Sequence, residues 1–161
     1  MHDNNLIDEF LKSAYAFKEK TVKLSGELLD YYPDIENAWS VREHIVHIVD
    51  SEINNFIRIK SAIAQPDSSC YVINEERWVK NLRGKNENIE KYVSVFVLLR
   101  ELLYEFLNDM PGEDWNSKYF IRDDNGKKDR ITIEKGIEIY KNHVFSHMNF
   151  IDRNIEAFMN R

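Results

Sequence analysis

Two histidines near the end of the chain, His143 and His147, are four residues apart. The stretch around them has the periodicity of a long helix, and residues i and i+4 of a helix lie on the same face. Two imidazoles placed this way can hold one metal ion between them. Catalytic zinc centres usually have three protein ligands, so such a centre needs a third ligand from another part of the chain.

Two further histidines, His44 and His47, lie in an earlier segment that also has helical periodicity. Ligands from facing helices of a bundle can meet in one site. On a helical projection of ~100° per residue, His44 falls nearer to the apolar stripe than His47. Periodicity alone therefore favours His44 as the third ligand. The competing interpretation is that these histidines lie on the surface and are neighbours by chance.

Three carboxylates close to His47 are candidates for a general base or for an acceptor that orients a ligand: Glu43, Asp50 and Glu52. Each also has a simpler explanation, since Glu43 fits a helix cap and the other two fit a polar helix surface. Three tryptophans in or beside the connections either wall a pocket or pack in the core at the bundle ends: Trp39, Trp78 and Trp115.

Four segments of roughly 25 residues have apolar residues at a spacing of three or four, which predicts helices. They cover residues 6–31, 41–64, 86–110 and 132–159. Pro33 ends the first helix, and Ser40 with Glu43 forms a capping box that opens the second. Pro111 and the following glycine end the third helix, and Thr132 caps the fourth. This pattern predicts an all-α four-helix bundle as a single domain over residues 1–161.

Two longer connections, residues 65–85 and 113–131, are compatible with crossovers between the helices. In the first, Asn74–Lys80 has the pattern of one or two helical turns. In the second, Asn125 and Gly126 stand between two β-prone runs, which is a hairpin signal. We therefore expect a small β-ribbon before the last helix.

The composition excludes several classes of function. A formal net charge of −6 and a pI near 5.4 argue against a nucleic-acid partner, because phosphate binding needs clustered Lys and Arg. Cys70 is the single cysteine, so no internal disulfide can form, and we expect a reduced, cytoplasmic setting. The polar start of the chain lacks the apolar segment of a signal peptide, and no apolar run approaches the ~20 residues that span a membrane.

The run from Trp39 to Glu52 resembles the second-helix signature of the DinB/YfiT-like superfamily. In that signature a Trp, a capping Ser or Thr, and a metal-binding His eight residues after the Trp recur. The pair His143 and His147 resembles the fourth-helix signature. The resemblance covers both signature helices and the helix lengths, and so nearly the whole chain. Two other runs look most like the YfiT branch: Asn54–Lys60 and Asn74–Trp78.

The resemblance places the metal-binding triad on His47, His143 and His147, so it favours His47 where periodicity favours His44. It also implies a crossover topology, a divalent metal such as zinc or nickel, and a homodimer. Members are described as metal-dependent hydrolases, and some as thiol S-transferases that use bacillithiol or mycothiol. We therefore expect an enzyme for a small-molecule substrate, with a low-molecular-weight thiol as one candidate cofactor.

This sequence departs from the YfiT branch at Glu52 and Ser146, where that branch has histidines. These departures affect the substrate and the general base more than the metal. Three neutral imidazoles would leave the ion an open position for water or for a thiolate, and the sequence does not separate hydrolysis from thiol transfer. The competing hypothesis is a non-catalytic bundle, with a structural metal or none, that works as a binding or dimerisation module.

Overall fold

The computed structural model describes residues 4–82, 87–124 and 126–161. Its four long helices are α1 (Asn4–Thr21), α3 (Val41–Ala64), α5 (Ile89–Asn108) and α7 (Ile133–Met159). The shorter elements are α2 (Gly26–Leu29), β1 (Ser69–Tyr71), α4 (Glu75–Asn81), α6 (Asp114–Ser117), β2 (Tyr119–Asp124) and β3 (Lys127–Thr132).

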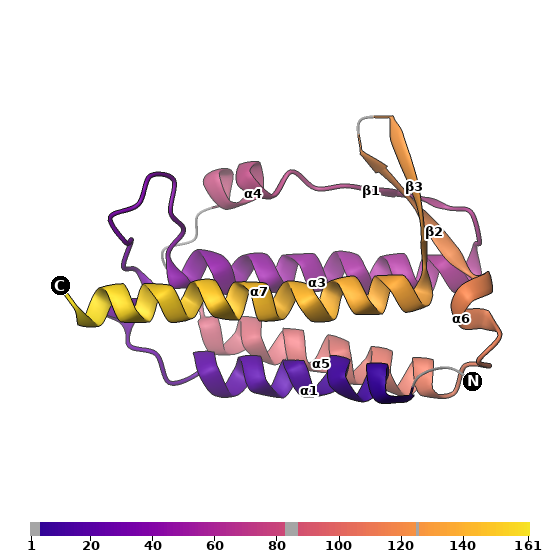
Figure 1. Cartoon of the computed structure of the whole chain (residues 1–161), viewed down its shortest axis with the longest axis horizontal. Helices are drawn as coiled ribbons and strands as arrows, with labels where there is room; N and C mark the ends of the chain where they lie inside the picture. The colour runs from indigo at the N-terminus through magenta and orange to yellow at the C-terminus, as the bar shows by residue number, and fades with distance from the viewer. Residues whose placement is uncertain (1–3, 83–86, 125) are drawn as a thin grey trace.

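The long helices form a four-helix bundle in which α1 and α3 each pack against both α5 and α7. Helices α3 and α5, which are consecutive among the four long helices, run in the same direction (Figure 1). The connection between them therefore returns along the outside of the bundle and carries β1 and α4 (Figure 1). The predicted four-helix bundle with a crossover connection is confirmed.

Helix starts follow the side chains that cap them. The Ser40 hydroxyl accepts from the Glu43 backbone N–H at 3.2 Å, and the Glu43 carboxylate accepts from the Ser40 N–H at 2.9 Å. This is the predicted capping box. Thr132 caps α7 by accepting from the Lys135 N–H at 3.3 Å, also as predicted.

Two predicted helix boundaries are wrong. The first helix does not continue to residue 31, because α1 ends at Thr21 and a separate short helix, α2, follows with Ser25 as its N-cap. Leu28 and Leu29 are still buried, so the apolar pattern of the sequence continues past the point where the helix is interrupted. The third helix begins at Ile89, because Asn88 caps it; Asn86, the predicted start, lies outside the described residues.

The predicted β-ribbon is present as the antiparallel pair β2 and β3, with Phe120 opposite Ile131. An unpredicted third strand, β1, pairs in parallel with β2 through Ser69 and Ile121, in the strand order β1-β2-β3. The sheet thus ties the crossover connection to the ribbon at one end of the bundle (Figure 1). The predicted helical turns at 74–80 are confirmed as α4.

The hydrophobic core consists of two clusters, one toward each end of the bundle. Along α1, Phe10 belongs to one cluster and Ala14 to the other, with the buried Ser13 between them. Along α5, the buried Arg100 occupies the corresponding place. A layer of polar side chains therefore crosses the middle of the bundle, and the histidines of α3 and α7 lie beside it.

Candidate metal centre

Helices α3 and α7 bring the four histidines of the two sequence motifs together. His44 directly follows Glu43 of the capping box, His47 comes three residues later in α3, and His143 and His147 lie near the middle of α7. Because the two helices pack against one another, the pairs face across their interface. His44, His47 and His147 are 7%, 2% and 8% exposed, and His143 is half-buried. They are not chance neighbours on the surface.

The ring nitrogens lie at contact distance. His47 Nε2 is 3.1 Å from His143 Nε2, and His44 Nδ1 is 2.9 Å from His147 Nδ1. Among the described residues, His47, His143 and His147 form a group whose ligand atoms all lie within 4.8 Å of one another. These are the three residues that the resemblance nominates. His44 is outside that group and contacts it through His147.

All four imidazoles have pKa values far below the ordinary value. Burial is the main cause, and it lowers the pKa of His44 and of His143 to about 4. Burial together with the neighbouring histidines lowers the pKa of His47 to about 3 and that of His147 to about 2. The rings are therefore neutral at physiological pH, which is the form in which an imidazole nitrogen has a lone pair for a metal.

Two aromatic side chains enclose the histidines. The Trp39 ring lies 5.2 Å from His47, 5.3 Å from His44 and 6.0 Å from His147, measured between ring centroids. Phe150 stacks on His44 with an interplanar angle of 4°. These rings fix the imidazole planes and shield them from water. Of the other predicted tryptophans, Trp78 lines a cavity beside the histidines, and Trp115 is buried in the core.

The helical projection misjudged His47, which is more buried than His44. The projection assumed a single apolar stripe facing the bundle. Helix α3 is covered on a second side by α4, whose Trp78 lines a cavity together with His47. A polar position beside the main stripe is thus enclosed by the crossover connection.

The three candidate carboxylates have different surroundings. Glu43 is the cap, as the simpler explanation held. Glu52 is not polar helix surface: it is 1% exposed and accepts from the Arg100 guanidinium at 2.9 and 3.1 Å, so it serves a structural ion pair rather than the histidines. Asp50 is half-buried, and burial together with the nearby Glu87 raises its pKa to about 6.

Among the described residues, Glu75 at the start of α4 has a carboxylate close to the histidines. Its Oε2 lies 3.7 Å from His47 Nε2, and its side chain is half exposed. Burial raises the pKa of Glu75, while Arg122 and Arg58 oppose the shift. The sequence pattern did not nominate Glu75, because nothing in spacing shows that the crossover would bring it to α3. The only signal was its place in the YfiT-like run Asn74–Trp78.

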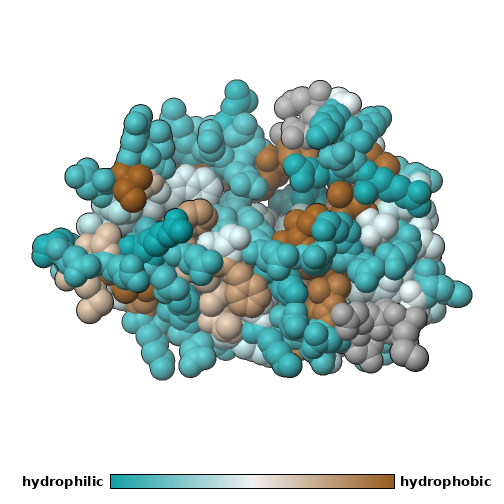
Figure 2. Space-filling view, in the orientation of Figure 1, coloured by the Kyte–Doolittle hydropathy of each residue, from teal (hydrophilic) through white to brown (hydrophobic). Residues whose placement is uncertain are grey.

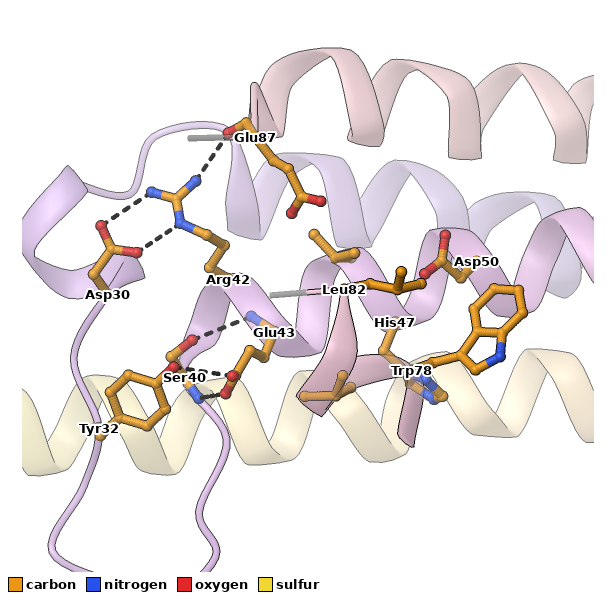
Figure 3. Close-up of a pocket in the computed structure, with 12 residues that line it drawn as sticks. Asp30, Tyr32, Ser40, Arg42, Glu43, His47, Asp50, Trp78, Leu82 and Glu87 are labelled. Carbon is orange, nitrogen blue, oxygen red and sulfur yellow. Dashed lines mark hydrogen bonds and ion pairs between the residues drawn. The ribbon is translucent and has the colours of Figure 1, made fainter. Parts of the chain in front are cut away.

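Two cavities adjoin the histidines. The first, of about 170 Å³, lies between α3 and α4; Figure 3 shows His47, Asp50 and Trp78 along it. The second, of about 160 Å³, lies between α3, α7 and the sheet and reaches His143. We call them the α4 cavity and the ribbon cavity. The face of the molecule that carries α4 and the ribbon is hollowed between them (Figure 2).

The arrangement fits a divalent ion. Zn–N bonds of ~2.0–2.1 Å place two nitrogens of a tetrahedral ion about 3.3 Å apart, and the Nε2 atoms of His47 and His143 are 3.1 Å apart. Imidazole suits zinc, nickel and related ions. Neutral, buried rings need no proton removed before they bind. The group consists of three histidines and contains no carboxylate or thiolate as a fourth ligand. An ion held by the three histidines would therefore keep an open coordination position.

A four-helix bundle with this crossover, and with histidines on α3 and α7, is the arrangement that the DinB/YfiT resemblance implies. The solved structure of YfiT from Bacillus subtilis matches 96% of this chain and 86% of its own, with a TM-score of 0.85 at 19% sequence identity. That protein is described as "a probable metal-dependent hydrolase with an unusual four-helix bundle topology". At this identity the match shows the fold.

Sequence relatives carry the same name. A "putative metal-dependent hydrolase" of Oceanobacillus iheyensis is 29% identical over 148 residues, which are 92% of this chain and 83% of that protein. One of Halalkalibacterium halodurans is 27% identical over 73% of this chain. YfiT itself is 21% identical over 74% of it. The chain spans just under two thirds of the last two relatives, 66% and 65%.

No family model matches the chain. The resemblance to the YfiT-like proteins is confirmed by the named relatives and by the shared fold. None of the helices in the described part of the chain is both long and apolar enough to cross a membrane.

Proposed function

We propose that this chain is a metal-dependent hydrolase of a small-molecule substrate, with His47, His143 and His147 as the ligands of a zinc or nickel ion. The observation that carries the proposal is the group of three neutral, largely buried imidazoles with ligand atoms within 4.8 Å. The sequence relatives named as metal-dependent hydrolases support the reaction class.

When bound, a divalent ion supplies Lewis-acid polarisation of a carbonyl and activation of water for attack. The chain's own residues do the rest. Glu75 Oε2, 3.7 Å from His47 Nε2 and open to solvent, is the atom that we assign to receive the proton from the attacking water. Trp39 covers three of the imidazoles and keeps bulk water away from that side.

In this proposal His44 is not a ligand. It shares a hydrogen bond between its Nδ1 and that of His147, at 2.9 Å. Ligand histidines nearly always use their second ring nitrogen in such a bond, which fixes the tautomer and the ring orientation. In this proposal His147 Nδ1 donates the bond and His44 Nδ1 accepts it, which leaves the lone pair of His147 Nε2 for the ion. Phe150, stacked on His44, holds that ring in turn.

Thiol S-transfer is the second reaction that the same centre could support, because a cationic metal stabilises a thiolate. The names of the relatives favour hydrolysis. A bacillithiol-type thiol would act in place of water as the attacking group. Both reactions need the same three ligands, so they are separated by product analysis and not by ligand substitution.

We also propose a single domain, residues 1–161, that forms a cytoplasmic homodimer. The single Cys70 fits a reducing compartment. The outer faces of α3 and α5 expose apolar side chains, among them Ile57 at 57%, Leu98 at 57% and Leu102 at 52%. An apolar face of this kind is typical of protein interfaces, and light scattering of the purified protein measures whether two copies associate.

The proposal is tested by metal content and turnover of protein purified without an affinity tag. We expect elemental analysis to find about one zinc or nickel per chain, and the loaded protein to hydrolyse simple esters or amides. A thiol adduct in place of the hydrolysed product would favour the transferase. If the wild-type protein binds no more metal than His147→Ala, the enzyme hypothesis fails and the non-catalytic bundle is the better explanation.

A further inference from the structure

We propose that the ribbon cavity binds a carboxylate group of the substrate through Arg58 and Arg122, next to the reacting bond. The inference rests on the proposed function, since it names the substrate class of the same centre. It is carried by the position of the cavity, by the charges that line it, and by its contrast with the α4 cavity.

The ribbon cavity opens directly onto the candidate centre. His143 forms part of its wall, and so does Ser51, whose hydroxyl lies 3.5 Å from His47 Nε2. The cavity therefore reaches the pair of imidazoles that we assign to the ion. Its volume of about 160 Å³ suits a group of a few heavy atoms. A substrate anchored there would have its next bond at the histidines.

The charges that line this cavity favour an anion. Two guanidinium groups, Arg58 from α3 and Arg122 from β2, line it, and Glu75 is the single carboxylate among its lining residues. Both arginines act electrostatically on Glu75 and on the Tyr140 phenol, lowering the pKa of each against the effect of burial. A planar guanidinium matches a carboxylate with two parallel hydrogen bonds.

The two arginines come from different elements and are held differently. Arg58 donates to the hydroxyl of the buried Tyr140, which fixes its position against α7. Arg122 is exposed, and its strand register places it opposite Asp129, which does not line the cavity. Arg58 is thus fixed in the wall of the cavity, and Arg122 can contact a ligand from the side of the sheet.

The α4 cavity would repel the same group. It contains the Asp50 and Glu87 carboxylates, close enough for Glu87 to raise the pKa of Asp50. Its one guanidinium, Arg42, bonds to Asp30 at 2.6 and 3.1 Å (Figure 3). Two cavities of similar size flank His47 and His143 with opposite charge character. A substrate with a carboxylate at one end is therefore bound in a single direction, with that end under the sheet.

The experiment measures binding of succinate and of its neutral analogue succinamide to the metal-free protein by NMR titration. Because no metal is needed, the result does not depend on the proposed hydrolase activity. We expect succinate to bind more tightly than succinamide, and Arg122→Gln to weaken succinate binding on the order of tenfold. Equal binding of the two compounds, or no effect of Arg122→Gln, would overturn the inference.

Arg130→Gln is the matched control. Arg130 lies on the neighbouring strand opposite Ile121, so its side chain projects from the other face of the ribbon, where it stacks on Tyr119. It removes the same charge from the same ribbon without touching the cavity, and we expect succinate binding to stay within twofold of wild type. An equal loss in both variants would mean that only the general charge of the ribbon matters.

A second measurement joins the inference to the reaction. The zinc-loaded protein is given two esters that release the same leaving group. One is a half-ester of succinic acid with a free carboxylate, and the other is the same compound with that carboxylate converted to a methyl ester. We expect a higher kcat/KM for the anionic ester, and loss of that preference in Arg122→Gln but not in Arg130→Gln. Hydrolysis of neither ester would count against the proposed function alone, because the succinate titration is independent of it.

Discussion

Two buried polar clusters lie side by side in the bundle and are built on opposite principles. In the first, Arg100 is completely buried and its donors reach Glu52, Ser13 and the backbone carbonyls of Phe10 and Tyr140. In the second, the histidines of α3 and α7 contact mainly one another and aromatic rings. One cluster is charged and saturated with partners, while the other is neutral.

The difference separates a structural cluster from a functional one. A buried ion pair is tolerated when nearly every donor and acceptor has a partner, and it then holds its helices in one register. Four adjacent imidazoles gain little from one another, because a charge on any of them is opposed by burial and by its neighbours. A role in binding a ligand therefore explains the histidine cluster better than a contribution to the stability of the fold.

The largest expected effect is on metal binding, and it distinguishes the two histidines of α3. We expect His47→Ala to abolish binding of zinc or nickel, because it removes one of three proposed ligands. His44→Ala should keep the site but weaken it by roughly 10–100-fold, the usual cost of losing a group that orients a ligand. Competition with a chelator measures both affinities. The reverse ranking would make His44 the ligand and would refute the triad.

The pH dependence of stability is the next test of the contrast. In the metal-free protein the four histidines stay neutral down to pKa values of about 2 to 4, whereas in the unfolded chain they protonate near 6.5. Below about pH 6.5 the unfolded state thus binds more protons, and stability falls as the pH falls, by up to about 1.4 kcal/mol per pH unit for each histidine.

Urea unfolding at a series of pH values between 7.5 and 5 gives the free energy of unfolding at each pH, and from these values the change in stability per pH unit. The control is the variant with His143 and His147 both replaced by Gln, which should show a smaller slope over the same range. A wild-type slope no steeper than that of the control would mean that the imidazoles titrate normally in the folded state. The histidine cluster would then not differ from an exposed group.

The long helices were predictable from the sequence because their signals are local. The Ser40 and Glu43 capping box and the Thr132 cap lie within one turn of the residues they cap, and the structure shows each where the sequence placed it. The break after Thr21 was missed because Leu28 and Leu29 continue the apolar pattern beyond it. Strand β1 was missed because it has three residues and depends on pairing with a strand about fifty positions later.

The candidate centre was predictable only in part, for the same reason. The spacing of His143 and His147 is a local signal. His47 was nominated by its place eight residues after Trp39 in the family signature, whereas helical periodicity favoured His44. The approach of Glu75 to His47 is set by the path of the crossover, and the burial of Glu52 by a partner on α5. Helical periodicity describes one helix at a time, so it could assign neither.

Breaking the saturated cluster should lower the stability of the fold. Arg100→Met leaves the Glu52 carboxylate buried without its cation, which typically costs about 3–5 kcal/mol. We expect urea unfolding to show that loss. The double variant Arg100→Met with Glu52→Gln should recover part of it, because no bare charge remains. A cost of under ~1 kcal/mol for Arg100→Met would mean that the pair behaves as an exposed one.

The smallest expected effect comes from a single hydroxyl at the edge of the saturated cluster. Ser13 accepts from the Arg100 guanidinium and donates to the Phe10 carbonyl at 2.7 Å. Ser13→Ala should lower the free energy of unfolding by about 1 kcal/mol, the usual net value of a buried hydrogen bond. Ser94→Ala is its control, since that hydroxyl bonds to the Glu90 carbonyl on the exposed face of α5.

We expect Ser94→Ala to stay within about 0.5 kcal/mol of wild type, and neither variant to change metal affinity. The Ser13 hydroxyl bonds to the Arg100 guanidinium and to the Phe10 carbonyl, so a shift in metal affinity in Ser13→Ala would show that the two clusters are coupled through Arg100. That outcome has a physical route, because the positive charge of Arg100 contributes to the lowered pKa of His143. Unchanged affinity would mean that the hydroxyl serves only to hold the guanidinium in place.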